Sequence, residues 1–393
     1  MDRYAAAARA NVPPFHVMDL LAASAERQRT RGDMVNLLAG QPSTGAPATV
    51  SAEAVRLLGS GDPLGYTPAT GIVELREAVA AHYRRTYAIE VSAEDVIVTT
   101  GSSGGFLLAF LAAFDVGDRV AIARPGYPCY RNVLTALGCE VVEIATGPGS
   151  RFQPTVEQLA EAHARTPLAG VVVASPANPT GTMLLPAELA AIAVWCEESG
   201  VQLVSDEIYH GIEYAPLTHG EALARCAWET SREAVVFGSF SKYFSMTGWR
   251  LGWMLAPERL RRPVDVLTGN FSICPPALAQ RAALAAFDEA AYAELDGHVQ
   301  RYANNRTLLL DGLRRLGITG LAPADGAFYA YADVGHLTDD SMAYARSLLD
   351  RTGVAVATGV DFDTVDGGRF LRFSFAGTAD DITTALDRMD GSL

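Results

Sequence analysis

Lys242 is the residue whose surroundings in the sequence most clearly suggest chemistry. It comes shortly after the apolar, β-branched segment 234–239, and Arg250 follows it by eight residues. On a solvated surface a lysine simply stays charged. At the end of a buried strand it loses hydration, its pKa falls, and the neutral amine becomes a nucleophile or a base. We therefore interpret Lys242 as a candidate catalytic amine that needs an electrophile nearby.

Further polar side chains follow short apolar runs elsewhere in the chain. In sequence order they are Gly101, Ser102 and Ser103, then Asn178, then Asp206 and Tyr209, then Ser239 and Ser241. The first group leads into a helical segment, and the amides and hydroxyl groups at a helix N-terminus suit a phosphate. Because ligands bind at the carboxyl ends of the strands in open α/β sheets, these groups are expected to converge.

The elements that must hold these residues alternate between strands and helices. Short apolar runs occupy residues 96–100, 119–123, 140–144, 170–175, 201–206 and 234–239, with helical spacing between several of them. This pattern predicts an α/β fold, with a three-layer α/β/α large domain built on a mostly parallel sheet. Residues 251–255 follow the last run so closely that we expect an antiparallel strand there.

Near residue 280 the alternation of strand-like and helical segments gives way to a long helical stretch. A chain of 393 residues is long enough for two domains. A long helical stretch over 275–316 leads into apolar segments near residues 327–334 and 369–377. We expect an N-terminal arm and part of a small domain in 1–45. The large domain would occupy 46–280, and a smaller α+β domain 281–393.

Composition narrows the partners. The net charge of −14 argues against nucleic acid or an anionic membrane as the main partner. The apolar run 106–114 is too short to span a bilayer, and the N-terminus lacks the apolar stretch of a signal peptide. Five scattered cysteines indicate free thiols in a reducing compartment, and the histidines show no metal-binding spacing. We expect a cytoplasmic protein without a metal site.

The order and spacing of these motifs resemble fold type I pyridoxal-phosphate-dependent aminotransferases of the aspartate aminotransferase family (class I/II), over nearly the whole chain. Asn178 and Asp206 are 28 residues apart, Asp206 and Lys242 are 36 apart, and Lys242 and Arg250 are 8 apart. Pyridoxal 5′-phosphate needs an amine for its aldehyde, an acid for its ring nitrogen and donors for its phosphate. The resemblance implies a homodimer with shared active sites that transfers an amino group between an L-amino acid and a 2-oxo acid by a ping-pong mechanism.

The resemblance also implies roles in cofactor binding. Lys242 would form the Schiff base and then act as the general base, while Asp206 would pair with the ring nitrogen. Tyr209 and Asn178 would hydrogen-bond the 3′-oxygen, and Tyr127 would stack on the ring. The phosphate site would comprise Gly101, Ser102, Ser103, Ser239, Ser241 and Arg250, with Tyr66 reaching the phosphate of the neighbouring subunit.

Substrate binding is implied at a second arginine. Arg372 resembles the residue that binds the substrate α-carboxylate, a task for which a planar bidentate guanidinium is suited. Asn178 would assist it, and Gly40 lies in the loop that would close over the carboxylate.

The expected preference for the donor side chain depends on the absence of a cationic residue that would bind a second carboxylate. Ser103 stands where related aspartate-specific enzymes often carry a lysine. Phe15, Val17 and Phe271 could instead line an apolar pocket for a neutral aliphatic donor such as valine or alanine, with pyruvate or 2-oxoglutarate as acceptor. Aspartate stays open as a donor, since an arginine of the N-terminal arm could enter the site; the candidates are Arg27, Arg29 and Arg31.

Other functions remain as alternatives. The same lysine could serve a Cα–S lyase or a decarboxylase on this fold. Residues 101–105 match the G-x-S-x-G pattern of a hydrolase, with Ser103 as nucleophile. A cofactor-binding regulator is a third alternative, although the first 35 to 40 residues leave no room for a DNA-binding segment.

Overall fold

The computed structural model describes residues 6–214, 216, 219–220 and 222–392. Its largest sheet has seven strands in the order β2-β8-β7-β6-β5-β3-β4. In chain order these strands are β2 Val96–Thr99, β3 Arg119–Arg124, β4 Glu140–Ala145, β5 Gly170–Ala174, β6 Gln202–Asp206, β7 Val235–Ser239 and β8 Gly252–Leu255. As predicted, β8 runs antiparallel to both neighbours, and the remaining pairs are parallel.

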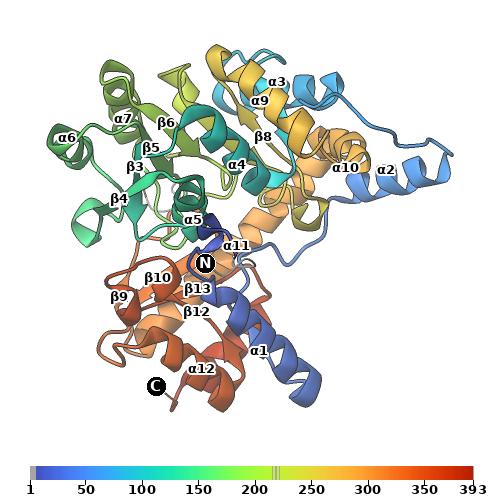
Figure 1. The fold of residues 1–393 in the computed structure, drawn as a ribbon. Helices are drawn as coiled ribbons and strands as arrows, with labels where there is room; N and C mark the ends of the chain where they lie inside the picture. The colour runs from blue at the N-terminus through green and yellow to red at the C-terminus, as the bar shows by residue number, and fades with distance from the viewer. Residues whose placement is uncertain (1–5, 215, 217–218, 221, 393) are drawn as a thin grey trace.

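The helices of this region are interspersed with the strands along the chain, as the alternating sequence pattern predicts. In chain order they are α2 Ala48–Gly59, α3 Val73–Tyr87, α4 Gly101–Ala113, α5 Pro128–Leu137, α6 Val156–Arg165, α7 Pro186–Glu198, α9 Glu258–Phe271 and α10 Ala277–Ala282. Helix α4 packs on β7 and β8, α7 on β6, and α3 on β2. The three-layer α/β arrangement is therefore confirmed (Figure 1).

The two ends of the chain form a second region beside this sheet. It contains a four-stranded sheet, β12-β13-β10-β9, and a two-stranded sheet that pairs β1 with β11. The strands are β1 Val35–Asn36, β9 Gly320–Leu321, β10 Tyr329–Asp333, β11 Val354–Ala355, β12 Ala357–Thr358 and β13 Phe370–Ser374. The helices are α1 His16–Arg31, α11 Glu289–Arg315, α12 Ser341–Thr352 and α13 Ala379–Met389. Figure 1 shows α1 beside α12, at the opposite end of the sequence.

One continuous apolar core joins the two regions. It includes Phe237 on β7 and Phe373 on β13, both almost fully buried. The domain boundaries expected after residues 45 and 280 remain a prediction.

The long helix expected over 275–316 is interrupted. Helix α10 ends at Ala282, a 3₁₀ turn covers Ala283–Phe287, and α11 begins at Glu289. Asp288 has extended backbone angles, which stop the helical hydrogen bonding there.

Across the described residues, no helix combines the length and apolar character needed to cross a bilayer. The expectation about a signal peptide involves residues 1–5, which lie outside the described residues.

Candidate active site

A cavity of about 260 Å³ lies at the carboxyl ends of the central strands, between the large sheet and the region formed by the chain ends. It brings together most of the residues that the sequence singles out. These are Gly40, Ser102, Ser103, Tyr127, Asn178, Asp206, Tyr209, Ser241, Lys242, Arg250 and Arg372. The convergence follows from the parallel strands, whose ends share one edge of the sheet.

Lys242 is half-buried just beyond the end of β7. Its Nζ donates a hydrogen bond to the Gly40 carbonyl at 2.7 Å and lies 5.3 Å from the centre of the Tyr209 ring. Burial lowers the pKa of Lys242 to about 8, with Arg372 and Arg250 adding to the effect and Asp206 opposing it. A substantial fraction of this amine is therefore neutral near pH 8, where a surface lysine would be fully protonated. Lys242 is also the only lysine in the chain, since every other cationic side chain among the 31 Lys and Arg residues is an arginine.

Asp206 is a buried carboxylate at the end of β6. Its Oδ2 accepts a short hydrogen bond from the Tyr130 hydroxyl, and its Oδ1 accepts one from the Ile208 amide at 3.2 Å. Burial raises the pKa of Asp206 to about 6, while these two donors and Lys242 limit the rise. A cationic group placed in the cavity beside Asp206 would favour the ionised carboxylate.

Arg250 crosses the beginning of helix α4. It lies in the left-handed region at φ 52°, and its Nη1 donates to the Thr247 carbonyl at 2.9 Å. A Cβ on Gly101 would come within 2.5 Å of Arg250 Nη2, and Gly101 itself has φ +69°. Glycine is thus required for the guanidinium to reach the helix N-terminus. Together with Ser102, Ser103 and Ser241, this arrangement suits an anion.

Arg372, on β13, is buried on the opposite side of the cavity. Its Nη1 donates to Asn178 Oδ1 at 2.9 Å and its Nη2 to the Leu38 carbonyl at 2.7 Å. The guanidinium also lies over the Tyr329 ring at 4.5 Å. Its Nε has no hydrogen-bond partner within the described part of the chain, so a buried donor remains for a ligand.

Aromatic side chains form much of the remaining wall. The Tyr209 and Tyr329 hydroxyl groups share a hydrogen bond at 2.6 Å. Tyr127 meets Tyr130 and Phe15 edge to face, with ring centres 5.5 and 6.5 Å apart. Flat apolar surfaces of this kind can sandwich a planar ring.

Several residues named in the sequence interpretation lie outside the cavity lining, among them Gly101, Ser239, Tyr66 and Phe271. Ser239 is buried, and its hydroxyl accepts from the Ser241 amide at 3.0 Å. Gly101 acts through the space that it leaves for Arg250. Tyr66 is 83% exposed and Phe271 is 60% exposed, so within one chain neither side chain is covered by the site.

The sequence interpretation missed two tyrosines and most of the contribution of α1. Tyr130 lies three residues after Tyr127 on α5, a helical spacing that could have indicated it. Tyr329 sits on β10, whose position beside β13 is set only by the tertiary fold. Met18 and Leu21 of α1 line the cavity together with Phe15 and Val17.

The arm arginines proposed as readers of a second carboxylate are not in the cavity lining. Arg27 is paired with Asp33 and donates to the Leu349 and Asp350 carbonyls, and Arg29 is paired with Glu26. Neither pair brings a guanidinium into the site.

Comparison with known proteins agrees with this geometry. Residues 32–389 match the family described as aminotransferase class I and II. The chain is 63% identical over 383 residues to the valine–pyruvate aminotransferase of Mycobacterium tuberculosis, covering 98% of this chain and 97% of that protein.

Two solved structures extend the comparison. The fold matches the crystal structure of an aminotransferase from Mycobacterium tuberculosis with a TM-score of 0.96, at 62% identity and with 100% and 99% of the two chains covered. It also matches the Thermus thermophilus aspartate aminotransferase with maleate, with a TM-score of 0.90 at 31% identity and 99% and 100% coverage. The chain is an aminotransferase and belongs to the aminotransferase class I and II family.

Proposed function

We propose that this aminotransferase uses pyridoxal 5′-phosphate to transfer the amino group of a neutral aliphatic amino acid, with valine as the first candidate, to pyruvate. The observation that carries this proposal is the identity of 63% to a valine–pyruvate aminotransferase across almost the whole chain. The apolar cavity wall of Phe15, Val17 and Leu21 supports it independently.

The donor set fits the cofactor. Gly101 lacks the Cβ that would collide with Arg250, so the guanidinium reaches the start of α4. There it would hold a phosphate together with the hydroxyl groups of Ser102, Ser103 and Ser241. Asp206 is a buried carboxylate in the lining of the same cavity and would pair with a protonated ring nitrogen. Lys242 offers the only side-chain amine that the chain possesses.

Bound there, pyridoxal 5′-phosphate would supply an electrophilic aldehyde and an electron-withdrawing ring. Lys242 Nζ, neutral in part because its pKa is lowered to about 8, would remove the substrate Cα proton and hold it for return. Asp206 would keep a proton on the ring nitrogen through its carboxylate. Tyr127 would stack on the ring, and Asn178 and Tyr209 would hydrogen-bond its 3′-oxygen.

Arg372 would orient the amino acid. Its Nε has no acceptor in the described chain, and a substrate α-carboxylate would satisfy this buried donor. Gly40 is held against Arg372 and Tyr329, since a Cβ there would lie 2.9 Å from the tyrosine oxygen. The chain can therefore pass close to the carboxylate only with glycine at this position.

The cavity favours a neutral donor over aspartate. Arg250 and Arg372 are the only cationic groups besides Lys242 that line it among the described residues, and both have other roles. A second carboxylate would then be buried against apolar side chains of α1, which is unfavourable without a partner.

The experiment is a steady-state comparison of valine, alanine and aspartate as donors, with pyruvate and 2-oxoglutarate as acceptors. We expect a neutral donor to give the highest kcat/KM. Aspartate faster by more than tenfold, about 1.4 kcal/mol in barrier, would contradict the neutral pocket. Release of ammonia or CO₂ instead of a 2-oxo acid would indicate the lyase or decarboxylase alternative.

The serine hydrolase alternative has weak support. Ser103 does line the cavity, but no histidine does so within the described part of the chain, and a serine nucleophile needs such a base. Labelling of Ser103 by a fluorophosphonate probe would be required to revive it.

We also propose a homodimer with shared sites. Tyr66, Leu58, Phe271 and Ile273 are large apolar or aromatic side chains that are 49–83% exposed. Helix α2 and the chain after it project away from the rest of the molecule in Figure 1, as a segment that reaches a second copy would. Light scattering should give twice 41.7 kDa, and a mass of 41.7 kDa would contradict the dimer.

Cytoplasmic location is proposed from the free cysteines and tested by cell fractionation.

A further inference from the structure

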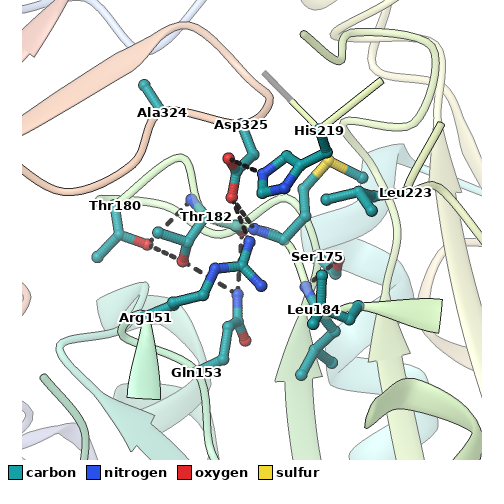
Figure 2. Close-up of polar contacts among 12 residues, drawn as sticks. Arg151, Gln153, Ser175, Thr180, Thr182, Leu184, His219, Leu223, Ala324 and Asp325 are labelled. Atoms are coloured by element: carbon teal, nitrogen blue, oxygen red, sulfur yellow. Dashed lines mark hydrogen bonds and ion pairs between the residues drawn. The ribbon is translucent and has the colours of Figure 1, made fainter. Parts of the chain in front are cut away.

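A buried ion-pair cluster lies behind the active-site cavity, centred on Asp325 in the turn before β10. Asp325 is 1% exposed. Its carboxylate accepts from Arg151 Nη2 at 2.7 Å, pairs with His219 Nε2 at 3.1 Å and accepts from the Met183 amide at 3.4 Å. Figure 2 shows Arg151 and His219 approaching Asp325 from two different segments.

The backbone that presents Arg151 is strained. Arg151 and Phe152 have φ angles of 53° and 58°, a region that bulky side chains rarely occupy. Such a conformation persists only where the surroundings fix it. The fixing contacts are the ion pair to Asp325 and the edge-to-face packing of Phe152 on Tyr331, with ring centres 6.2 Å apart.

Hydrogen bonds and close packing join the cluster to the loop that carries Asn178. The Gly326 amide donates to the Gly181 carbonyl at 2.8 Å, and the Gly181 amide donates to the Ala177 carbonyl at 2.7 Å. A Cβ on Gly326 would lie 2.4 Å from Pro176 Cγ, so the two segments are in close contact. From the other side, Gln153 Nε2 donates to the Thr182 carbonyl at 3.0 Å (Figure 2).

The segment around Asp325 also fixes the part of the site that carries Tyr329. The Tyr214 amide donates to the Asp325 carbonyl at 2.6 Å, and the Ala327 amide donates to the Ile212 carbonyl at 2.9 Å. Two residues further on, Tyr329 contacts both Tyr209 and Arg372. One short segment therefore sets the positions of Asn178 and Tyr329 around the Arg372 guanidinium.

We propose that the Asp325–Arg151 pair is a positioning unit for the substrate-carboxylate site. It fixes loop 177–183 so that Asn178 Oδ1 faces Arg372, although neither member of the pair lines the cavity. This inference rests on the proposed function of Arg372 in binding the α-carboxylate. Without the pair, loop 177–183 relaxes, and the guanidinium keeps the Leu38 carbonyl but loses Asn178 Oδ1, the other acceptor that orients it.

The test is Asp325→Asn, which keeps the size of the side chain and removes its charge. We expect KM for the donor amino acid to rise about tenfold or more, because small displacements of positioning groups have effects of this order. We expect kcat and the affinity for pyridoxal 5′-phosphate to fall by a smaller factor than KM rises, because Lys242, Asp206 and the groups around the phosphate are untouched and only the contact of Asn178 with the 3′-oxygen is displaced. Arg151→Met should raise KM in the same way and serves if Asp325→Asn does not fold.

Asp95→Asn is the matched control. Asp95 is 8% exposed, pairs with Arg261 and accepts from the Ser92 amide, but it lies before β2, at the end of the sheet away from the cavity. This variant should lower the Tm and leave KM unchanged. If Asp325→Asn behaves like Asp95→Asn, the pair is merely structural and the proposal is overturned.

A crystal structure of the cofactor-free Asp325→Asn protein separates this inference from the proposed function. We expect the distance between Asn178 Oδ1 and Arg372 Nη1 to exceed the 2.9 Å of the native chain and the hydrogen bond to be lost. An unchanged contact would overturn the inference even if the wild-type enzyme is an efficient transaminase. Failure of the wild type to turn over any donor would instead refute the proposed function and leave the geometric result standing.

Discussion

The two walls of the active-site cavity are built in different ways. One wall carries Ser102, Asp206, Lys242 and Arg250, which lie at or near the ends of strands of the large sheet. Asp206 ends β6, Ser102 and Lys242 come three residues after β2 and β7, and Arg250 comes two residues before β8. The other carries Phe15 and Val17 from the beginning of the chain and Tyr329 and Arg372 from its last quarter. The first wall is polar and has its spacing set by the sheet. The second combines one cation with apolar and aromatic groups and is assembled by long-range packing.

This difference suggests a division of labour. The groups proposed to hold the cofactor belong to the sheet wall, and those proposed to select the substrate belong to the wall formed by the chain ends. Buried strands hold the first set, whereas α1 packs against β12 of the small sheet. Changes in the second wall should therefore alter donor preference without disturbing the chemistry.

The largest expected effect comes from the sheet wall. Lys242→Ala removes the proposed base and covalent anchor, and kcat should fall by about 10³-fold or more. Measuring single-turnover rates with the preferred donor checks this, with circular dichroism to show that the variant is folded. Retention of a tenth of the native rate would remove Lys242 from the mechanism.

Replacing each of the two cavity arginines by lysine tests whether the two walls have different functions. Arg372→Lys loses the planar fork that presents Nε to a carboxylate, and we expect KM for the donor to rise roughly 100-fold, on the order of 3 kcal/mol. Arg250→Lys should instead weaken binding of pyridoxal 5′-phosphate and leave donor KM at saturating cofactor nearly unchanged. Similar effects of both changes on one parameter would erase the proposed division.

A smaller effect is expected from α1. Val17→Ala removes an apolar contact with the side chain of the donor valine, and this contact is worth about 1.5 kcal/mol. The ratio of kcat/KM for valine over alanine should then fall about tenfold, with the alanine rate itself little changed. The two donors can be compared in one competition assay, and an unaltered ratio would place the donor side chain elsewhere.

The mildest test concerns protonation. Because the pKa of Lys242 is lowered to about 8 from 10.5, an amine-selective acylating reagent should modify the cofactor-free protein at Lys242 with a midpoint near pH 8. The unfolded chain binds more protons at this residue between pH 8 and 10.5, so its contribution to the free energy of unfolding should increase as the pH rises through that window. Peptide mapping by mass spectrometry distinguishes Lys242 from the terminal amine, and a midpoint above pH 10 would mean that the amine is solvated.

The sheet wall was predictable because its residues follow recognisable strands at short distances along the chain. Asp206 ends an apolar run, Lys242 comes three residues after one, and Arg250 follows Lys242 by eight residues. Local pattern and parallel topology therefore suffice to bring them together. The substrate wall was predicted less completely. Arg372 was identified only through resemblance, and Tyr329 was missed because its place beside Arg372 depends on the pairing of β10 with β13.

Other differences also have physical causes. The break at Asp288 depends on how α10 and α11 pack, which helical periodicity does not reveal. Phe271 lies at the end of α9 and is exposed in the single chain, so its place in the apolar pocket stays a prediction that depends on a second subunit. Tyr130 was overlooked beside Tyr127, although the buried Asp206 needs a donor of this kind.

Because the chain has a single lysine, it has a single cleavage site for proteases that cut after lysine. A lysine-specific protease would cut the denatured chain at one peptide bond, giving residues 1–242 and 243–393. Reduction of the cofactor onto the amine beforehand would block that cut. The proportion of uncut chain on a gel would then report the fraction of molecules that carried the cofactor.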